Sequence, residues 1–136
     1  MTALTQDRKT PMKAGDALVL PVAASTKIFA GSLVAINASG YAVPGSTSTT
    51  LKGAGRAEQA VDNSGGSAGA LTVEVRKGVF LFGNSASADL ITITDIGNDC
   101  YIVDDQTVAK TNGSNTRSVA GKIFDVDASG VWVKFE

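Results

Sequence analysis

Short apolar runs separated by turn residues dominate the chain from residue 16 onward. Leu71, Val73 and Val75 alternate with polar residues, which is the period-two pattern of a strand with one face in solvent. Other short runs, among them 17–23, 33–36 and 118–126, are bounded by Gly, Ser, Thr, Asn or Asp. No convincing amphipathic helix interrupts them. We therefore predict an all-β sandwich or barrel of about eight to ten short strands.

Two segments are ambiguous between strand and helix. Residues 51–61 contain one helix-like turn, but Gly53 and Gly55 lie just ahead of it and no apolar stripe extends further, so the pattern favours a strand. Residues 90–93 are compatible with a strand or with a short helical turn capped by Thr94.

Two strands have a predicted position within the fold. Pro21 cannot donate a hydrogen bond to a neighbouring strand, so the strand 17–23 lies at a sheet edge or is bulged there. Residues 79–82 are apolar on both faces, which predicts a strand buried between layers.

Turn residues mark the hairpins. Segments 38–40, 104–107 and 127–130 separate pairs of apolar runs, Asn112-Gly113 marks a further turn, and Lys77-Gly78 predicts a bend.

The first 14 residues differ from the rest. They contain Arg8, Lys9 and Lys13, one acidic residue, Pro11 and little apolar content. We expect 1–14 to be an extended arm and 15–136 to be a single β domain. The N-terminus has no apolar segment typical of a signal peptide, and no apolar run approaches the 18 or so residues that span a bilayer, so we expect synthesis in the cytoplasm and no membrane contact.

Composition excludes several kinds of chemistry. The chain has no His and one Cys, which rules out histidine bases, imidazole metal ligands, a CxxC pair and an intrachain disulfide. Cys100 lies in an apolar run and is predicted to be a buried small hydrophobe. Twelve basic and 13 acidic residues give a net charge of −1, so no overall field attracts nucleic acid. We predict that the protein is not an enzyme and binds no cofactor.

The closest match to a chemical motif is an EF-hand-like segment. Residues Asp125, Asp127, Ser129 and Gly130 followed by Glu136 match the calcium-loop spacing. A calcium loop needs flanking helices, whereas 131–135 alternates like a strand, so we predict a hairpin turn and no metal site.

The remaining candidates are weaker. The acidic residues Asp95, Asp99, Asp104 and Asp105 are typical of turns, and the basic residues of the arm lack the interleaved aromatics of a nucleic-acid site. Trp132 alternates with Val131 and Val133, and it is either second-layer core or an exposed anchor at an interface.

Several stretches together resemble the capsid cement, or head-decoration, proteins of tailed bacteriophages and related prophages. The resemblance covers most of the chain and is carried by Thr5–Arg8, Ile28–Gly31, Leu33–Val43, Asp62–Gly66, Arg76–Phe80, Cys100–Asp105 and Phe124–Asp127. It implies a small, non-enzymatic, jelly-roll-like β protein on the outside of the virion capsid. Its partner would be the major capsid protein, whose neighbouring subunits it would clamp, and it would form a dimer or trimer there.

Two segments are the expected contacts because neither can pack on itself. They are the arm residues 2–13 and the Gly-rich loop 62–70, and the contact residues we predict are Thr5, Gln6, Asp7, Arg8, Lys9, Lys13, Asp62, Asn63 and Trp132. The alternative function is a receptor- or sugar-binding β-sandwich module of a phage fibre, which would usually show clustered exposed aromatic residues.

Overall fold

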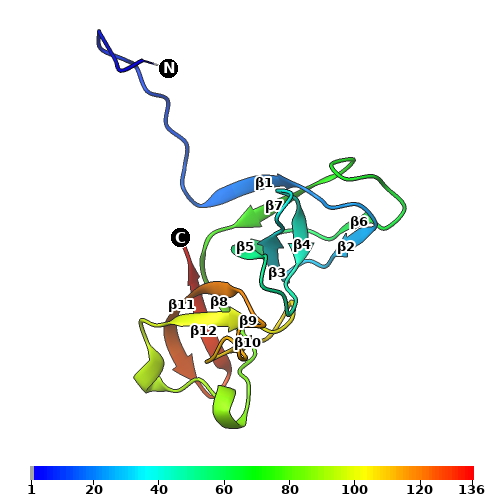
Figure 1. The fold of residues 1–136 in the computed structure, drawn as a ribbon, viewed down its shortest axis with the longest axis vertical. Helices are drawn as coiled ribbons and strands as arrows, with labels where there is room; N and C mark the ends of the chain where they lie inside the picture. Colours follow the sequence, from blue (N-terminus) through cyan, green and yellow to red (C-terminus); the bar gives the residue numbers. More distant parts are fainter. Residues whose placement is uncertain (1) are drawn as a thin grey trace.

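The computed structural model describes residues 2–136, and its regular secondary structure is almost entirely strand (Figure 1). The strands are β1 (Ala17–Pro21), β2 (Thr26–Ile28), β3 (Leu33–Ile36), β4 (Ala42–Pro44), β5 (Lys52–Ala57), β6 (Val61–Asn63), β7 (Thr72–Arg76), β8 (Gly78–Phe82), β9 (Asp99–Ile102), β10 (Val108–Ala109), β11 (Val119–Asp127) and β12 (Gly130–Phe135). Two single-turn 3₁₀ helices, η1 (Ser87–Asp89) and η2 (Ile93–Asp95), lie between β8 and β9. The all-β prediction is confirmed, while the jelly-roll topology implied by the resemblance stays a prediction.

The strands form three antiparallel sheets. The first sheet has the order β1-β7-β5-β3-β4, the second has β10-β9-β11-β12-β8, and β2 pairs with β6 in a small third sheet. The chain passes from the first large sheet to the second between β7 and β8. Gly78 has φ of +148° at that point, a conformation that favours glycine, so the predicted bend is confirmed.

Each large sheet curls until its two edges approach one another. Val22, which directly follows edge strand β1, bridges to Ala42 of the opposite edge strand β4. In the second sheet Gly83, which follows β8, bridges to Thr107, which precedes β10. Curling on this scale lets short strands enclose apolar side chains.

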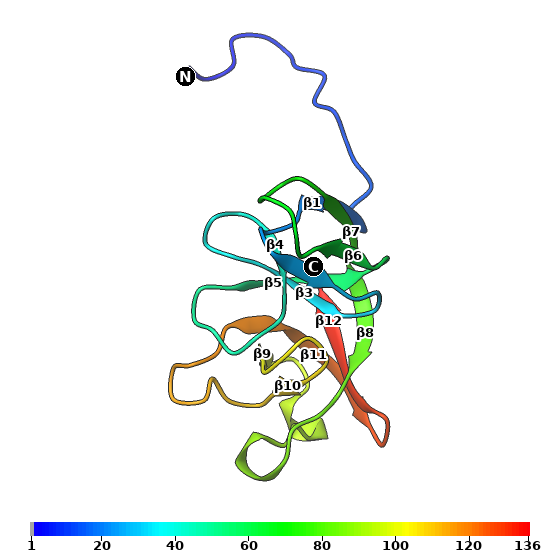
Figure 2. The same ribbon diagram turned by 90° about the vertical axis from the view of Figure 1, so that its right-hand side faces the viewer.

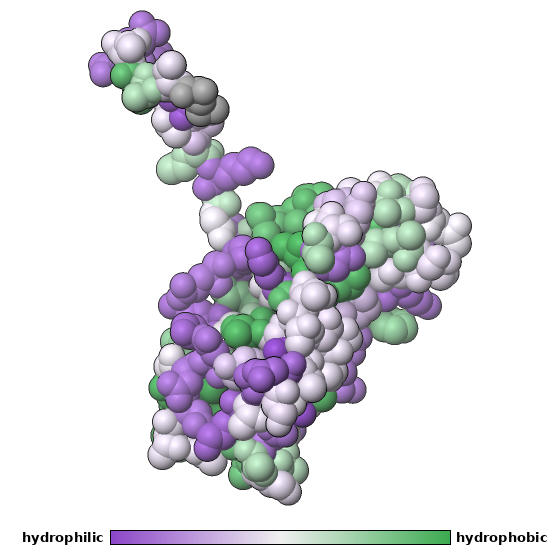
Figure 3. Space-filling view, viewed as in Figure 1, coloured by the Kyte–Doolittle hydropathy of each residue, from purple (hydrophilic) through white to green (hydrophobic). Residues whose placement is uncertain are grey.

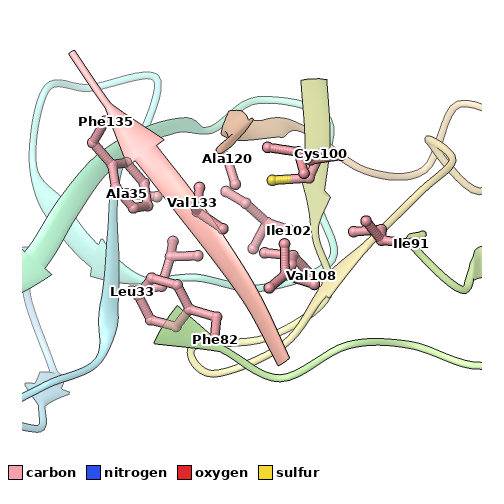
Figure 4. Close-up of a cluster of buried hydrophobic side chains, with 12 residues drawn as sticks. Leu33, Ala35, Phe82, Ile91, Cys100, Ile102, Val108, Ala120, Val133 and Phe135 are labelled. Atoms are coloured by element: carbon pink, nitrogen blue, oxygen red, sulfur yellow. The ribbon is translucent and has the colours of Figure 1, made fainter. Parts of the chain in front are cut away.

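Two hydrophobic clusters result, and β3 contributes to both. Leu33 and Ala35 point into the larger cluster, which the second sheet fills with residues such as Phe82, Ile102 and Val133 (Figure 4). Val34, on the other face of β3, lies in the smaller cluster with Val22, Ile28, Ala42, Ala54, Ala57, Val61, Val73 and Val75. All three of these β3 residues are fully buried, so β3 lies between the two clusters.

The prediction that residues 79–82 lie between layers is therefore wrong. Strand β8 is an edge strand of the second sheet, and Leu81 is 40% exposed on its outer face. Phe80 is half-buried and carries the Arg56 guanidinium 4.2 Å from its ring centroid. The run is apolar because it forms one wall of the larger cluster and also presents an exposed leucine.

Other local predictions are confirmed. Pro21 lies on edge strand β1, opposite Thr72. Residues 52–57 form strand β5 instead of a helix. Cys100 is fully buried, and this burial raises the pKa of its thiol to about 12. The segment 125–136 forms the β11–β12 hairpin.

The segment 90–93 leads into the single 3₁₀ turn η2, which begins at Ile93, and its cap differs from the prediction. The backbone N–H of Thr92 donates to the Asp95 carboxylate at 2.8 Å, so Thr92 occupies the N-cap position instead of Thr94.

The two large sheets touch backbone to backbone at Gly53. A Cβ built on this residue of β5 would collide with the carbonyl group of Ala120 on β11. Any side chain at position 53 would therefore separate the two sheets at the point where they meet.

We predict that Gly53→Ala destabilises the protein by about 1–3 kcal/mol, the usual range for overpacking, because backbone atoms cannot rotate away from the new methyl group. Thermal unfolding should show a melting temperature lower by several degrees. The matched control is Gly65→Ala, since a Cβ there meets open space, and its melting temperature should be unchanged. Equal melting temperatures for the two variants would contradict the close approach at Gly53.

Candidate functional site

The described chain before β1, from residue 2 onward, projects away from the body of the molecule (Figures 1 and 2). Residues 2–14 form no strand or helix, and all of them are exposed. Within this segment Arg8 donates a hydrogen bond to Thr10 Oγ1 at 3.0 Å, and Thr10 N donates to the Arg8 carbonyl at 3.1 Å. The predicted contact residues Thr5, Gln6, Asp7, Lys9 and Lys13 lie along the same segment with their side chains in solvent.

The arm differs from the body in charge and carries exposed apolar groups. Three basic side chains and one acidic one give residues 1–14 a formal charge of +2, which leaves −3 for residues 15–136 out of the total of −1. Met12 is 94% exposed and Leu4 is also exposed. The arm thus offers both cationic and apolar groups to an acidic surface.

Strand β1, which the arm enters, has an open edge. Lys77 N donates to the Asp16 carbonyl at 2.8 Å, and Val22 N donates to the Leu71 carbonyl at 2.9 Å. Antiparallel pairing alternates along a strand, so Leu18 and Leu20 direct their backbone groups toward β7. The N–H and C=O groups of Ala17 and Val19 therefore point away from the sheet and have no strand partner there.

Apolar side chains lie beside this edge. Val19 is 68% exposed, and Leu18 and Leu71 are also exposed. Figure 3 shows apolar surface next to the base of the arm. A long apolar strand edge is usually protected from pairing with other chains, and here only Pro21, which lacks an N–H, interrupts it.

Ion pairs fix the start of β1 to its neighbours. Arg76 contacts Asp16 at 3.3 Å and Glu58 at 3.6 Å, and Glu58 also contacts Arg56 at 2.7 Å. These groups are substantially exposed, so the network contributes modestly to stability and mainly orients the chain where the arm leaves the body.

The loop 62–70 is more ordered than its sequence predicts, and the expectation that nothing in it packs is wrong. Asn63 ends strand β6 and is only 2% exposed. Its Nδ2 donates to the carbonyls of Ala23 and Ser67, each at 3.0 Å, so the side chain holds the loop together instead of meeting a partner. The polar composition of the segment gives no sign of this burial. A polar amide such as that of Asn63 can lie in the interior once its hydrogen bonds are satisfied.

Asp62, by contrast, is exposed at the loop surface. Hydrogen bonds from Ser64 hold the pKa of its carboxyl below the ordinary value. The far end of the loop is tied to the end of β1, because Gly69 N donates to the Val22 carbonyl at 2.9 Å.

Trp132 lies in the second sheet, away from the arm. It is half-buried and outside the two core clusters, and its Nε1 donates to Asp127 Oδ2 at 2.9 Å. That bond, with a second from Ser129 N, lowers the pKa of the Asp127 carboxyl. The hydrogen bond from Trp132 therefore stabilises the β11–β12 turn.

The structure thus places the predicted contact residues in three separate regions. The arm and the 62–70 loop adjoin opposite ends of β1, whereas Trp132 belongs to the other sheet. Sequence reasoning missed Val19 and the open edge, although the edge position of the strand was readable from Pro21.

Two further properties concern residues 2–136. No helix in this range is long and apolar enough to cross a membrane. The same residues contain no group of three or more Cys, Asp or Glu placed to hold a metal ion.

Comparison with known proteins found no matching family, no matching curated protein and no matching solved structure.

The register of β1 predicts an alternating pattern of amide hydrogen exchange. The amides of Leu18 and Leu20 should be protected, whereas those of Ala17 and Val19 should exchange rapidly, because only the former donate within the sheet. NMR-detected exchange on the full chain measures all four. Equal protection along β1 would show that the edge is covered.

The Asp127–Trp132 hydrogen bond predicts an acid-sensitive fluorescence change. Because folding lowers the pKa of Asp127 below 3.8, the bond persists as pH falls through that ordinary value and is lost only as pH falls through the lower, folded pKa. Emission from Trp132, the single tryptophan, should therefore change with a midpoint below pH 3.8.

The control for this titration is Asp127→Asn, which retains an oxygen acceptor but does not titrate, and it should lack the change. Far-UV circular dichroism separates the local change from unfolding. An identical transition in the variant would assign the signal to other groups.

Proposed function

We propose that this chain is a capsid cement protein, which binds the outside of a tailed-bacteriophage head and clamps neighbouring major capsid protein subunits. The observation that carries the proposal is the exposed, cationic arm that continues into the open edge of β1. The resemblance in sequence points to the same role.

The arm is suited to docking on a neighbour. It buries nothing within its own chain, so it can order along a second surface without disturbing the two cores. Its basic groups favour an acidic surface, and Leu4 and Met12 supply apolar area. The body and the arm would then hold two different capsid subunits.

The physical effect would be thermodynamic linkage, in which binding of the protein stabilises the shell. A protein that binds only the assembled and expanded shell stabilises it by RT ln(1 + [L]/Kd) at each site. Many repeated sites make modest individual affinities sufficient. A dimer or trimer of the chain on the symmetry axes of the shell would multiply this effect, and the role requires no catalysis.

Removing the arm should separate binding from folding. Deleting residues 2–13 should leave the melting temperature unchanged, because these residues lie outside both clusters, and should weaken co-sedimentation with expanded, DNA-free heads of the phage that encodes the chain.

Heads without the chain should release DNA at a lower temperature than decorated heads, and adding the chain back should restore their resistance in proportion to occupancy. Undecorated and decorated heads that fail at the same temperature would overturn the proposal.

The charge of the arm provides a matched comparison. Arg8→Glu with Lys9→Glu should reduce binding to heads, and added salt should weaken binding of the unaltered chain, since exposed charges are screened within about 10 Å at 0.1 M. Lys52→Glu with Lys134→Glu changes the net charge equally, but both residues are exposed on the body and outside the predicted contacts, so this variant should bind normally. Equal loss in the two double variants would indicate a general charge effect in place of arm docking.

A further inference from the structure

A surface pocket lies where the two large sheets meet at the start of β3. It has a volume of about 330 Å³ and is lined by the turn Phe29–Ser32 and by Asp105 and Gln106. The first group connects β2 to β3, and the second lies between β9 and β10. This volume is at the lower end of the range for small-molecule sites, which fits a ligand of one or two sugar rings.

One of the residues that line the pocket is aromatic, and the protein covers less than half of it. Phe29 is 57% exposed. The ammonium of Lys27 lies 5.1 Å from the ring centroid. The rest of the ring is free to pack against the apolar face of a ligand.

The other wall is polar. Asp105 provides a carboxylate acceptor, and the Gln106 side chain provides an amide that both donates and accepts. Ser32 is only 7% exposed, and its Oγ has no hydrogen-bond partner among the described residues. Since a buried hydroxyl normally has a partner, the unpaired Ser32 hydroxyl beside the pocket is a group that a bound ligand would satisfy.

The walls are held by backbone hydrogen bonds. Leu33 N donates to the Asp105 carbonyl at 2.8 Å, Gly83 N to the Gln106 carbonyl at 2.7 Å, and Gly31 N to the Ala57 carbonyl at 2.9 Å. The pocket is therefore formed before any ligand arrives, which reduces the ordering required on binding.

The charges select among ligand classes. The Asp105 carboxylate disfavours phosphate and other anions, and the Lys27 ammonium beside Phe29 disfavours a second cation. A neutral ligand with hydroxyl groups and one apolar face satisfies all the groups present.

We propose that this pocket binds a neutral sugar unit, a hexose or N-acetylhexosamine, which packs on Phe29 and hydrogen-bonds Asp105, Gln106 and Ser32. The proposal does not rest on the capsid role, because none of these residues belongs to the arm or to β1. On a particle surface such a site would add weak, repeated adhesion to glycans.

The test titrates the isotope-labelled full chain with the methyl glycosides of glucose, galactose and N-acetylglucosamine, and follows amide shifts by NMR. At least one sugar should shift the amides of Gly31, Ser32 and Gln106 in a saturable manner. Phe29→Ala and Asp105→Asn should each weaken its affinity about tenfold or more, and the spectra of the variants verify that they fold.

The matched control is Phe124→Ala, because Phe124 is 55% exposed and lies on β11, outside the pocket lining. It should leave sugar affinity unchanged. No saturable shift with any of the three sugars, or equal losses for the Phe29 and Phe124 variants, would overturn the proposal.

An acetylated arginine amide serves as the competing probe. If it shifts the same amides at lower concentration than every sugar, the pocket accepts a basic side chain of a partner and the sugar proposal is wrong. The Phe29→Ala variant should still co-sediment with heads, so failure of this proposal is distinguishable from failure of the capsid role.

Discussion

The burial of β3 on both faces is the constraint on which the rest of the structure depends. Leu33 and Ala35 belong to one hydrophobic cluster and Val34 to the other, so three consecutive residues join two cores. Either five-stranded sheet alone would leave an apolar face in water. Loss of apolar volume in β3 would therefore weaken both clusters, whereas a change in an outer strand affects one.

The same constraint explains why the first sheet can leave an edge open. Strand β1 is separated from β3 by β7 and β5, and the cores are closed without its outer backbone groups. Those groups and the preceding arm can therefore change partners at little cost to folding. The ion pairs of Asp16, Arg76 and Glu58 keep the base of the arm in place, which directs it away from the body.

Local sequence determined much of the fold but little of the arrangement between sheets. Alternation along 71–76, the edge position of Pro21 and the Gly-containing hairpin turns are properties of neighbouring residues, and the structure agrees with them. The run 79–82 was assigned wrongly and the role of 33–36 was not recognised, since an apolar run looks the same whether it is buried on two faces or on one with an exposed leucine. The burial of Asn63 depends on Ala23, forty residues away, and no local pattern encodes it.

The sugar-sized pocket and the arm depend on the fold in different ways. The pocket lies between the loop that leads into β3 and the loop between β9 and β10, and the hydrogen bond from Leu33 N to the Asp105 carbonyl joins the two loops at the first residue of β3. Its geometry is therefore tied to the packing of the two cores. The arm needs only a rigid base at β1, which lies at the far edge of one sheet. The segment proposed to adapt to a neighbour thus lies apart from the pocket, whose shape depends on the packing at β3.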